Sequence, residues 1–220
     1  MPRPSVQSLH ESGEYRFVES FTIDEMPQFL AREAGLVKVP GPEESGKKGT
    51  PKWLLMGMLL FFGAAFGALL GFSINNTVSP SRVPVVGQIA IGVIGLFLVV
   101  LPLHEGIHAL FFKILGARQV GFGYSKKGMM VYAYAQRFVM TLRETALVAA
   151  MPFIFITFAL GGLLIFLPSL RAVWIILLLL HTLGCMGDFI LIAHAWKNRK
   201  AGMYTYDDLN EKRTYFFERQ

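Results

Sequence analysis

Four long runs of apolar residues, almost free of charge, constrain this chain more than any other feature. They lie at roughly residues 53–72, 86–112, 145–167 and 172–196. Each is about 20 residues or longer, which is enough for a helix to cross a hydrocarbon core about 30 Å thick. With 53% hydrophobic and only 16% charged residues, the chain is too apolar for an ordinary soluble domain. We therefore expect an all-α membrane protein with about four transmembrane helices.

The distribution of Lys and Arg predicts how these helices are oriented. Seven precede the first run, six lie between the second and third, and six follow the fourth, while the two other connections hold one each. Positive charge concentrates on the cytosolic side, so we expect a multi-pass protein of the cell membrane with both termini in the cytosol. The net charge of +6 is spread among acidic residues without a compact basic patch, which argues against a nucleic-acid partner.

This pattern predicts three parts in chain order. Residues 1–52 form a cytosolic N-terminal region and linker, residues 53–196 the membrane core, and residues 197–220 a cytosolic tail. The N-terminal region is either a small cytosolic subdomain or a partly disordered arm. Five apolar side chains could build the core of such a subdomain: Tyr15, Phe17, Phe21, Phe29 and Leu30. The sequence gives no indication of the oligomeric state.

The second run contains the stretch "LPLHEGIHAL", in which His104, Glu105 and His108 fit the pattern H-E-x-x-H. Each ionisable group at the centre of a lipid-facing helix costs roughly 2.5 to 3.5 kcal/mol on insertion scales. Histidines at i and i+4 share one helix face and can hold Zn²⁺, and the glutamate between them can deprotonate the attacking water. The alternative is a pair of core histidines hydrogen-bonded to Glu105 without a metal.

A catalytic zinc needs a third protein ligand, and Asp188 is our candidate. It is the only acidic residue of the fourth run. At 1.5 Å per residue it lies about 13 Å from the cytosolic edge, the same depth as His104. His181 could contact substrate, fix Asp188, or simply bond across helices. Cys185 could ligate a soft metal, although such a cysteine is more often a small packed residue.

The connection after the second run predicts a β-hairpin. "VGFGYS" and "MMVYAY" alternate around the turn signal "KKG", which gives strands near residues 120–125 and 129–134. Its aromatic residues, among them Phe122, Tyr124 and Tyr132, favour a position at the membrane interface. A free strand edge there could pair with an unwound substrate segment. A plain amphipathic surface loop is the alternative.

Three stretches resemble one known family. "HEGIHALFFKILGA", the proline in "AAMPF" and "HTLGCMGDF" are similar to small bacterial membrane proteins described as zincin peptidases, distant relatives of the site-2 proteases. The resemblance implies that His104, His108 and Asp188 are zinc ligands and that Glu105 is the general base. Site-2 proteases carry Asn and Pro ahead of Asp-Gly in the corresponding helix. Here Gly187 precedes Asp188 and Phe189 follows it.

The function predicted from these features is that of an intramembrane zinc metalloprotease acting on a membrane-anchored or membrane-proximal peptide. One alternative is a zinc-dependent membrane hydrolase with another amide or a lipid as its substrate. The other is a non-catalytic zinc-binding scaffold or regulator. Glu105 argues against the latter, because metal binding alone does not need it.

Overall fold

The computed structural model describes residues 3–37, 82–125 and 130–220. The first predicted membrane run, residues 53–72, lies outside the described residues. The chain divides into two compact units. The first, which we call the sheet unit, comprises Met1–Gly49, Glu105–Met151 and Gly187–Gln220. The second, the helical unit, comprises Thr50–His104 and Pro152–Met186.

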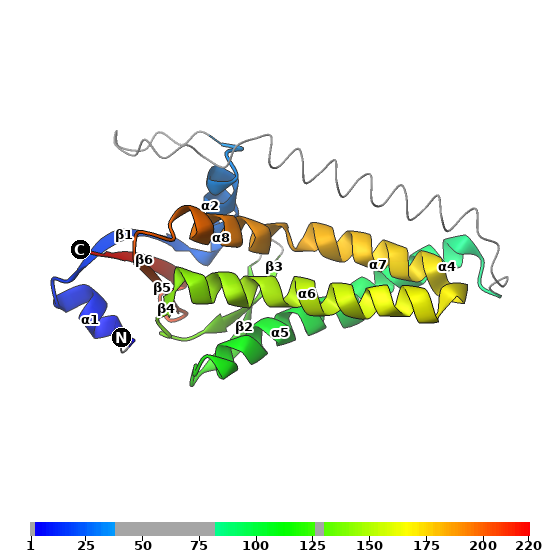
Figure 1. Ribbon diagram of the computed structural model, residues 1–220, viewed down its shortest axis with the longest axis horizontal. Coiled ribbons are helices and arrows are strands. Elements are labelled where there is room, and N and C mark those ends of the chain that lie inside the picture. The colour runs from blue at the N-terminus through cyan, green and yellow to red at the C-terminus, as the bar shows by residue number, and fades with distance from the viewer. Residues whose placement is uncertain (1–2, 38–81, 126–129) are drawn as a thin grey trace. The chain divides into compact units, whose positions relative to one another are not determined.

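A four-stranded antiparallel sheet in the order β1-β6-β5-β4 forms the centre of the sheet unit (Figure 1). Its strands are Tyr15–Thr22 (β1), Met140–Thr141 (β4), Met203–Asp208 (β5) and Arg213–Arg219 (β6). The expectation of an all-α protein was therefore wrong for this unit. The two terminal regions pair with each other, since β1 runs alongside β6 from Tyr15 to Thr22.

Two short helices accompany the sheet. Helix α1 spans Val6–Glu11, and α2 spans Met26–Glu33 after a 3-10 turn at Ile23–Glu25. The α2 region begins sharply because the Glu25 carboxylate accepts a hydrogen bond from the Thr22 backbone N–H at 2.7 Å. This capping contact gives the Thr22 N–H a hydrogen-bond partner at the start of the helical turn.

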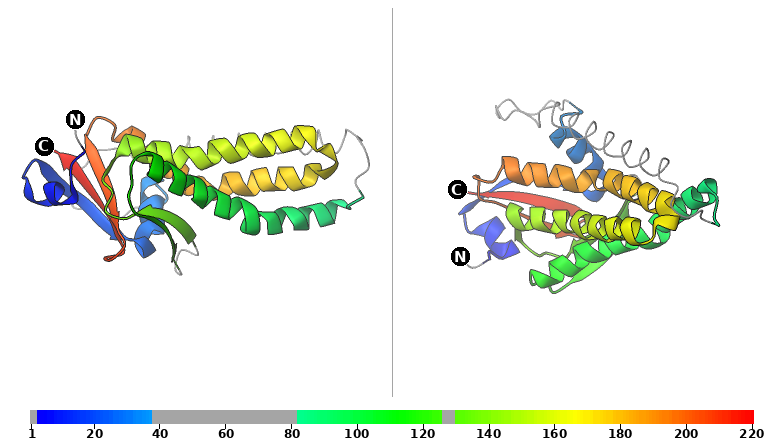
Figure 2. Two further views of the ribbon diagram at one scale, coloured as in Figure 1. Left: turned by 90° about the horizontal axis from the view of Figure 1, so that it is seen from below. Right: turned by 45° about the vertical axis from the view of Figure 1, so that its right-hand side comes forward.

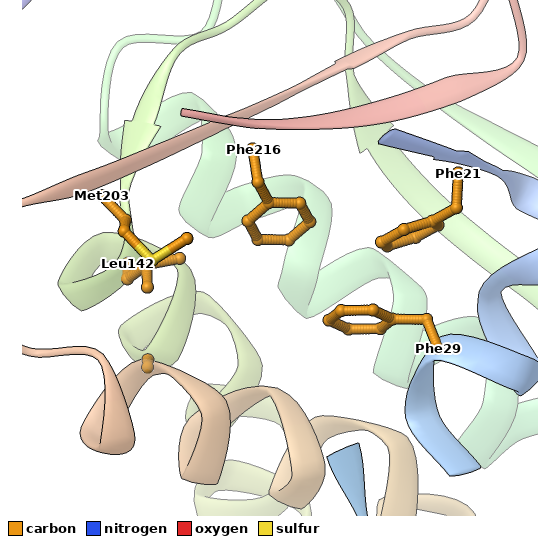
Figure 3. Packing of buried hydrophobic residues seen from close by; sticks show 6 residues of the cluster. Phe21, Phe29, Leu142, Met203 and Phe216 are labelled. Carbon is orange, nitrogen blue, oxygen red and sulfur yellow. The ribbon is translucent and has the colours of Figure 1, made fainter. Parts of the chain in front are cut away.

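Aromatic side chains hold this unit together (Figure 3). Phe21 stacks on Phe29 with ring centroids 4.4 Å apart, and Phe216 joins them. The expected small core around Phe21 and Phe29 is thus confirmed, with Leu30 packed against it. Phe17 does not belong to this core, because it remains 53% exposed. The alternative of a disordered arm is wrong for residues 3–37.

The predicted hairpin is present in the sheet unit. Strands β2 (Val120–Ser125) and β3 (Met130–Ala135) pair antiparallel and make a separate two-stranded sheet. The second strand was predicted near residues 129–134 and is described from Met130 to Ala135, while residue 129 lies outside the described residues. Phe122 pairs with Ala133, and this register decides which hairpin side chains share a face.

The described residues contain two helices that are long and apolar enough to cross a membrane. The first runs over Val85–Ile114 and is built from α4 (Val85–Gly95), a π-helical turn (Leu96–Val100) and α5 (Leu101–Ile114). The second is α6 (Leu142–Phe166). These agree with the predicted runs 86–112 and 145–167 within three residues.

The fourth predicted run is not one straight helix, as the sequence suggested. After a 3-10 turn at Pro168–Leu170, it forms α7 (Arg171–Gly184) and α8 (Met186–Lys197), bent by 44°. Cys185 lies at the break with ψ near 4°, outside the helical range. Glycines at 184 and 187 flank the break and are poor helix formers. The described residues therefore contain up to three spans, if the bent pair counts as one.

Helices α4 and α7 lie side by side in the helical unit (Figure 2). Gly92 permits this approach, because a Cβ atom there would overlap the Ile176 side chain. The side-chain amide of the buried Gln88 makes two hydrogen bonds, one of them to α7. Its Oε1 accepts from the Ala172 backbone N–H at 3.2 Å, and its Nε2 donates to the Val83 carbonyl at 3.1 Å.

Candidate metal centre

Both ring nitrogens of His108 have a partner in the sheet unit. Its Nδ1 lies 3.1 Å from the backbone carbonyl of Val148, and its Nε2 lies 3.5 Å from Asp188 Oδ1. A carbonyl can only accept a hydrogen bond, so Nδ1 carries a proton, and Nε2 is the ring nitrogen that faces the carboxylate. This is the arrangement by which proteins orient metal-binding imidazoles.

The break in the fourth run determines the setting of Asp188. Because α8 begins at Met186, Asp188 falls in its first turn, where the helix dipole favours a carboxylate. The distance of Asp188 from the end of α8 can be counted at 1.5 Å per residue. The same count does not extend back to His181, because the helix is interrupted at Cys185. His181 lies on α7, before the break, so it does not share a continuous helix with Asp188.

Glu105 is anchored by the hairpin. Its Oε2 accepts a hydrogen bond of 2.7 Å from the backbone N–H of Ala133 in β3, and the residue is 7% exposed. Since this N–H points to a side chain, it points away from β2 and belongs to the outer edge of β3. The carboxylate is thus held in one orientation by a backbone group whose position the strand fixes.

The three aromatic residues singled out on the predicted substrate-pairing hairpin differ in their surroundings. Phe122 and Tyr124 are 59% and 60% exposed. Tyr132 is only partly exposed, because its ring lies over Gly123, which leaves no room for a side chain there. Burial, followed by the negative charge of Asp207, raises the pKa of Tyr132, so this phenol stays protonated.

His104 lies on α5 four residues before His108, which places both imidazoles on one face of that helix. Within the helical unit, its ligand nitrogen, a His181 nitrogen and the Cys185 sulfur lie within 4.8 Å of one another. His181 and Cys185, which the sequence left with open roles, are therefore neighbours of His104.

The donor set fits a zinc ion. Groups of His, Cys and Asp side chains that could hold a metal are present among the described residues. Two imidazole nitrogens and a carboxylate oxygen are ordinary ligands of catalytic zinc, and they leave a coordination position for water or substrate. Nothing in the sequence pointed to the Val148 carbonyl or the Ala133 N–H, because backbone groups have no residue-type signature.

Comparison with protein families supports the same chemistry. The model of a family described as "Putative zincin peptidase" matches residues 97–203, a stretch that contains the H-E-x-x-H pattern, the hairpin and Asp188. The resemblance to zincin peptidases that was read from the sequence is confirmed over these residues, and a zincin family implies zinc. No curated protein and no solved structure gives a match.

Proposed function

We propose that this protein is an intramembrane zinc metallopeptidase of the site-2 protease type. His104, His108 and Asp188 would hold the zinc ion, and Glu105 would be the general base. The observation that carries the proposal is the approach of His108 Nε2 to Asp188 Oδ1 at 3.5 Å, two groups 80 residues apart in the chain. The His108 Nδ1 bond to the Val148 carbonyl supports it, because it directs the lone pair to this side.

When bound, zinc would polarise the scissile carbonyl and make water a better nucleophile. The chain's own contribution is proton transfer by Glu105. Its carboxylate takes a proton from the attacking water as the C–O bond forms, and passes it to the amine as the C–N bond breaks. The hydrogen bond from the Ala133 N–H holds the carboxylate ready for both steps.

The outer edge of β3 would receive an extended substrate segment. Alternate residues of β3 direct their backbone groups to this edge. Because the Ala133 N–H already donates to Glu105, the groups left for a substrate strand are the N–H and C=O of Val131 and the C=O of Ala133. A peptide added as a further strand would lie beside Glu105, with its scissile bond freed from helical hydrogen bonding. The exposed Phe122 and Tyr124 would rest among lipid headgroups close by, as interfacial aromatic residues do.

The cellular setting of the proposal follows from charge and hydropathy. Two or three apolar helices in the described residues indicate association with a membrane. We place the protein in the cell membrane as a multi-pass protein with cytosolic termini, because Lys and Arg concentrate in those regions. Its partners would be the bilayer and a membrane-anchored peptide or protein, and no nucleic acid.

The decisive experiment compares zinc content and cleavage in matched variants. Glu105→Gln keeps size and shape but cannot take a proton, so it should retain about one zinc per chain and lose about 10²- to 10⁴-fold in activity. Asp188→Ala should lose zinc. Glu218→Gln, in an exposed ion pair with Arg16, is the control and should change neither property. Metal analysis and mass spectrometry of membrane peptides measure both.

The same measurements can contradict the proposal. Loss of zinc in Glu105→Gln would mean that Glu105 is a ligand and not the base. Stoichiometric zinc and full turnover in Asp188→Ala would place the third ligand elsewhere. Lipid fragments appearing in place of peptide fragments, in a Glu105-dependent manner, would replace the peptidase by a lipid hydrolase.

A further inference from the structure

We infer that His104, His181 and Cys185 form a second metal site, built for a soft monovalent cation such as Cu⁺. All three residues belong to the helical unit, and their ligand atoms lie within 4.8 Å of one another. The site goes beyond the proposed peptidase because neither Cys185 nor His181 has a role in that chemistry. It shares His104 with the proposed zinc site, and that connection rests on the proposed function.

The distances fit a common ion between the three donors. The Cys185 sulfur lies 3.9 Å from His104 Nδ1 and 3.7 Å from both ring nitrogens of His181. With metal–sulfur and metal–nitrogen bonds of about 2.3 and 2.1 Å and an angle between trigonal and tetrahedral, such donors stand about 3.7 Å apart. The His104 and His181 rings are 5.6 Å apart at 74°, so both edges can face one point.

Local backbone geometry brings His181 and Cys185 together. Cys185 caps α7, and its backbone N–H donates to the His181 carbonyl at 3.0 Å. The residue leaves the helical path at the point where α7 and α8 separate. The same break that starts a new helix before Asp188 therefore also turns a thiol toward two imidazoles.

Burial decides which ion the site prefers. Cys185, His181 and His104 are 0%, 3% and 9% exposed, and the ring of Phe153 stacks on His181 at 6.2 Å. A thiolate, two neutral imidazoles and a monovalent cation sum to zero charge, whereas a divalent ion leaves one positive charge in apolar surroundings. Thiolate sulfur also favours soft Cu⁺. Three donors suffice for this ion, while structural zinc takes four.

Occupation of this site would have a consequence for the proposed zinc site. A neutral imidazole has a single lone pair, so His104 can bind only one of the two ions at a time. Cu⁺ held by Cys185 and His181 would therefore withdraw His104 from zinc. A soft-metal cation would act as an inhibitor that enters through residues outside the catalytic set.

Cu⁺ titration of the full-length protein in detergent, against a chromogenic Cu⁺ chelator, tests the site. The wild type should bind one tight Cu⁺ per chain with a sulfur-to-copper band in the near ultraviolet. Cys185→Ser, Cys185→Ala and His181→Ala should each bind at least tenfold more weakly, since each removes one of three ligands. Met186→Leu removes a neighbouring thioether and should bind Cu⁺ like the wild type. Two different cysteine variants guard against one that misfolds.

Zinc release measures the competition between Cu⁺ and zinc for His104. One zinc should leave the wild-type protein for each Cu⁺ bound, and none should leave Cys185→Ser. Equal Cu⁺ affinity in the wild type and all three ligand variants would overturn the site. If the wild type contains no zinc but Cu⁺ binding still requires Cys185 and His181, the peptidase proposal fails while the soft-metal site stands.

Discussion

The sheet unit and the helical unit use the same residue type in opposite ways. In the sheet unit, Phe216 and Phe217 are 3% and 2% exposed. In the helical unit, Phe158 and Phe166 of α6 are 79% and 81% exposed. An apolar surface of that kind is costly in water and is matched by lipid. The comparison separates a part that builds its own core from a part whose surface needs a bilayer.

Buried polar groups differ between the units as well. In the sheet unit, Glu33 pairs with His194 at 2.9 Å and with Lys197 at 3.6 Å. In the helical unit, Gln88 is satisfied by neutral backbone groups. Desolvating a charged pair costs less free energy beside water than inside a membrane. Each unit therefore satisfies its polar groups in the way that its surroundings allow.

The largest effect is expected from the same substitution made in both units. Phe216→Ala removes a buried ring from the aromatic core and should lower the free energy of unfolding by about 3 to 5 kcal/mol. Phe158→Ala removes an exposed ring and should cost less than about 1 kcal/mol. Chemical unfolding in mixed micelles measures both. Equal losses would mean that Phe158 is buried by a partner and that the contrast between the units is wrong.

The ion pair of Glu33 predicts an acid dependence confined to the sheet unit. Burial by itself would raise its pKa, but the hydrogen bond and charge of His194, with Lys197 and Arg32, hold the pKa at about 2. A depressed carboxyl pKa stabilises the fold above the unfolded value of 4.5, and this stability is lost as the pH falls toward 2. The shift corresponds to roughly 3 kcal/mol.

Unfolding measured between pH 6 and pH 2 tests this dependence. Glu33→Gln should lower the free energy of unfolding at pH 6 and reduce its further loss between pH 6 and pH 2. Glu218→Gln, which breaks an exposed pair with Arg16, should cost no more than about 1 kcal/mol. An unchanged loss between pH 6 and pH 2 in Glu33→Gln would assign the acid sensitivity to other carboxyl groups.

The smallest effect concerns helix packing within the helical unit. Gly92→Ala places a methyl group against Ile176 and 3.3 Å from the Val173 carbonyl, and should cost about 1 to 3 kcal/mol. Gly95→Ala meets nothing nearer than Leu177 at 3.9 Å, and should stabilise the helix by about 0.5 to 1 kcal/mol. Thermal unfolding in detergent compares them. A stabilising Gly92→Ala would show that α4 and α7 leave room for a methyl group between Gly92 and Ile176.

The sequence by itself determined the features that depend on local pattern. Hydropathy predicted runs at 86–112 and 145–167, which correspond to the helices at Val85–Ile114 and Leu142–Phe166. Alternation located the hairpin, and the spacing of His104 and His108 placed both on one helix face. These hold because a helix or hairpin repeats its geometry every few residues, so residue type and spacing suffice.

Only the tertiary structure decided the contacts that join distant parts of the chain. The pairing of β1 with β6, the Val148 carbonyl behind His108 and the Ala133 N–H on Glu105 all connect residues at least 28 positions apart. Backbone donors and acceptors are the same at every residue, so no sequence pattern marks the ones that are used. The break at Cys185 was missed for a related reason. An apolar run has the same composition whether its helix is straight or bent, and the neighbours with which it packs decide which form it takes.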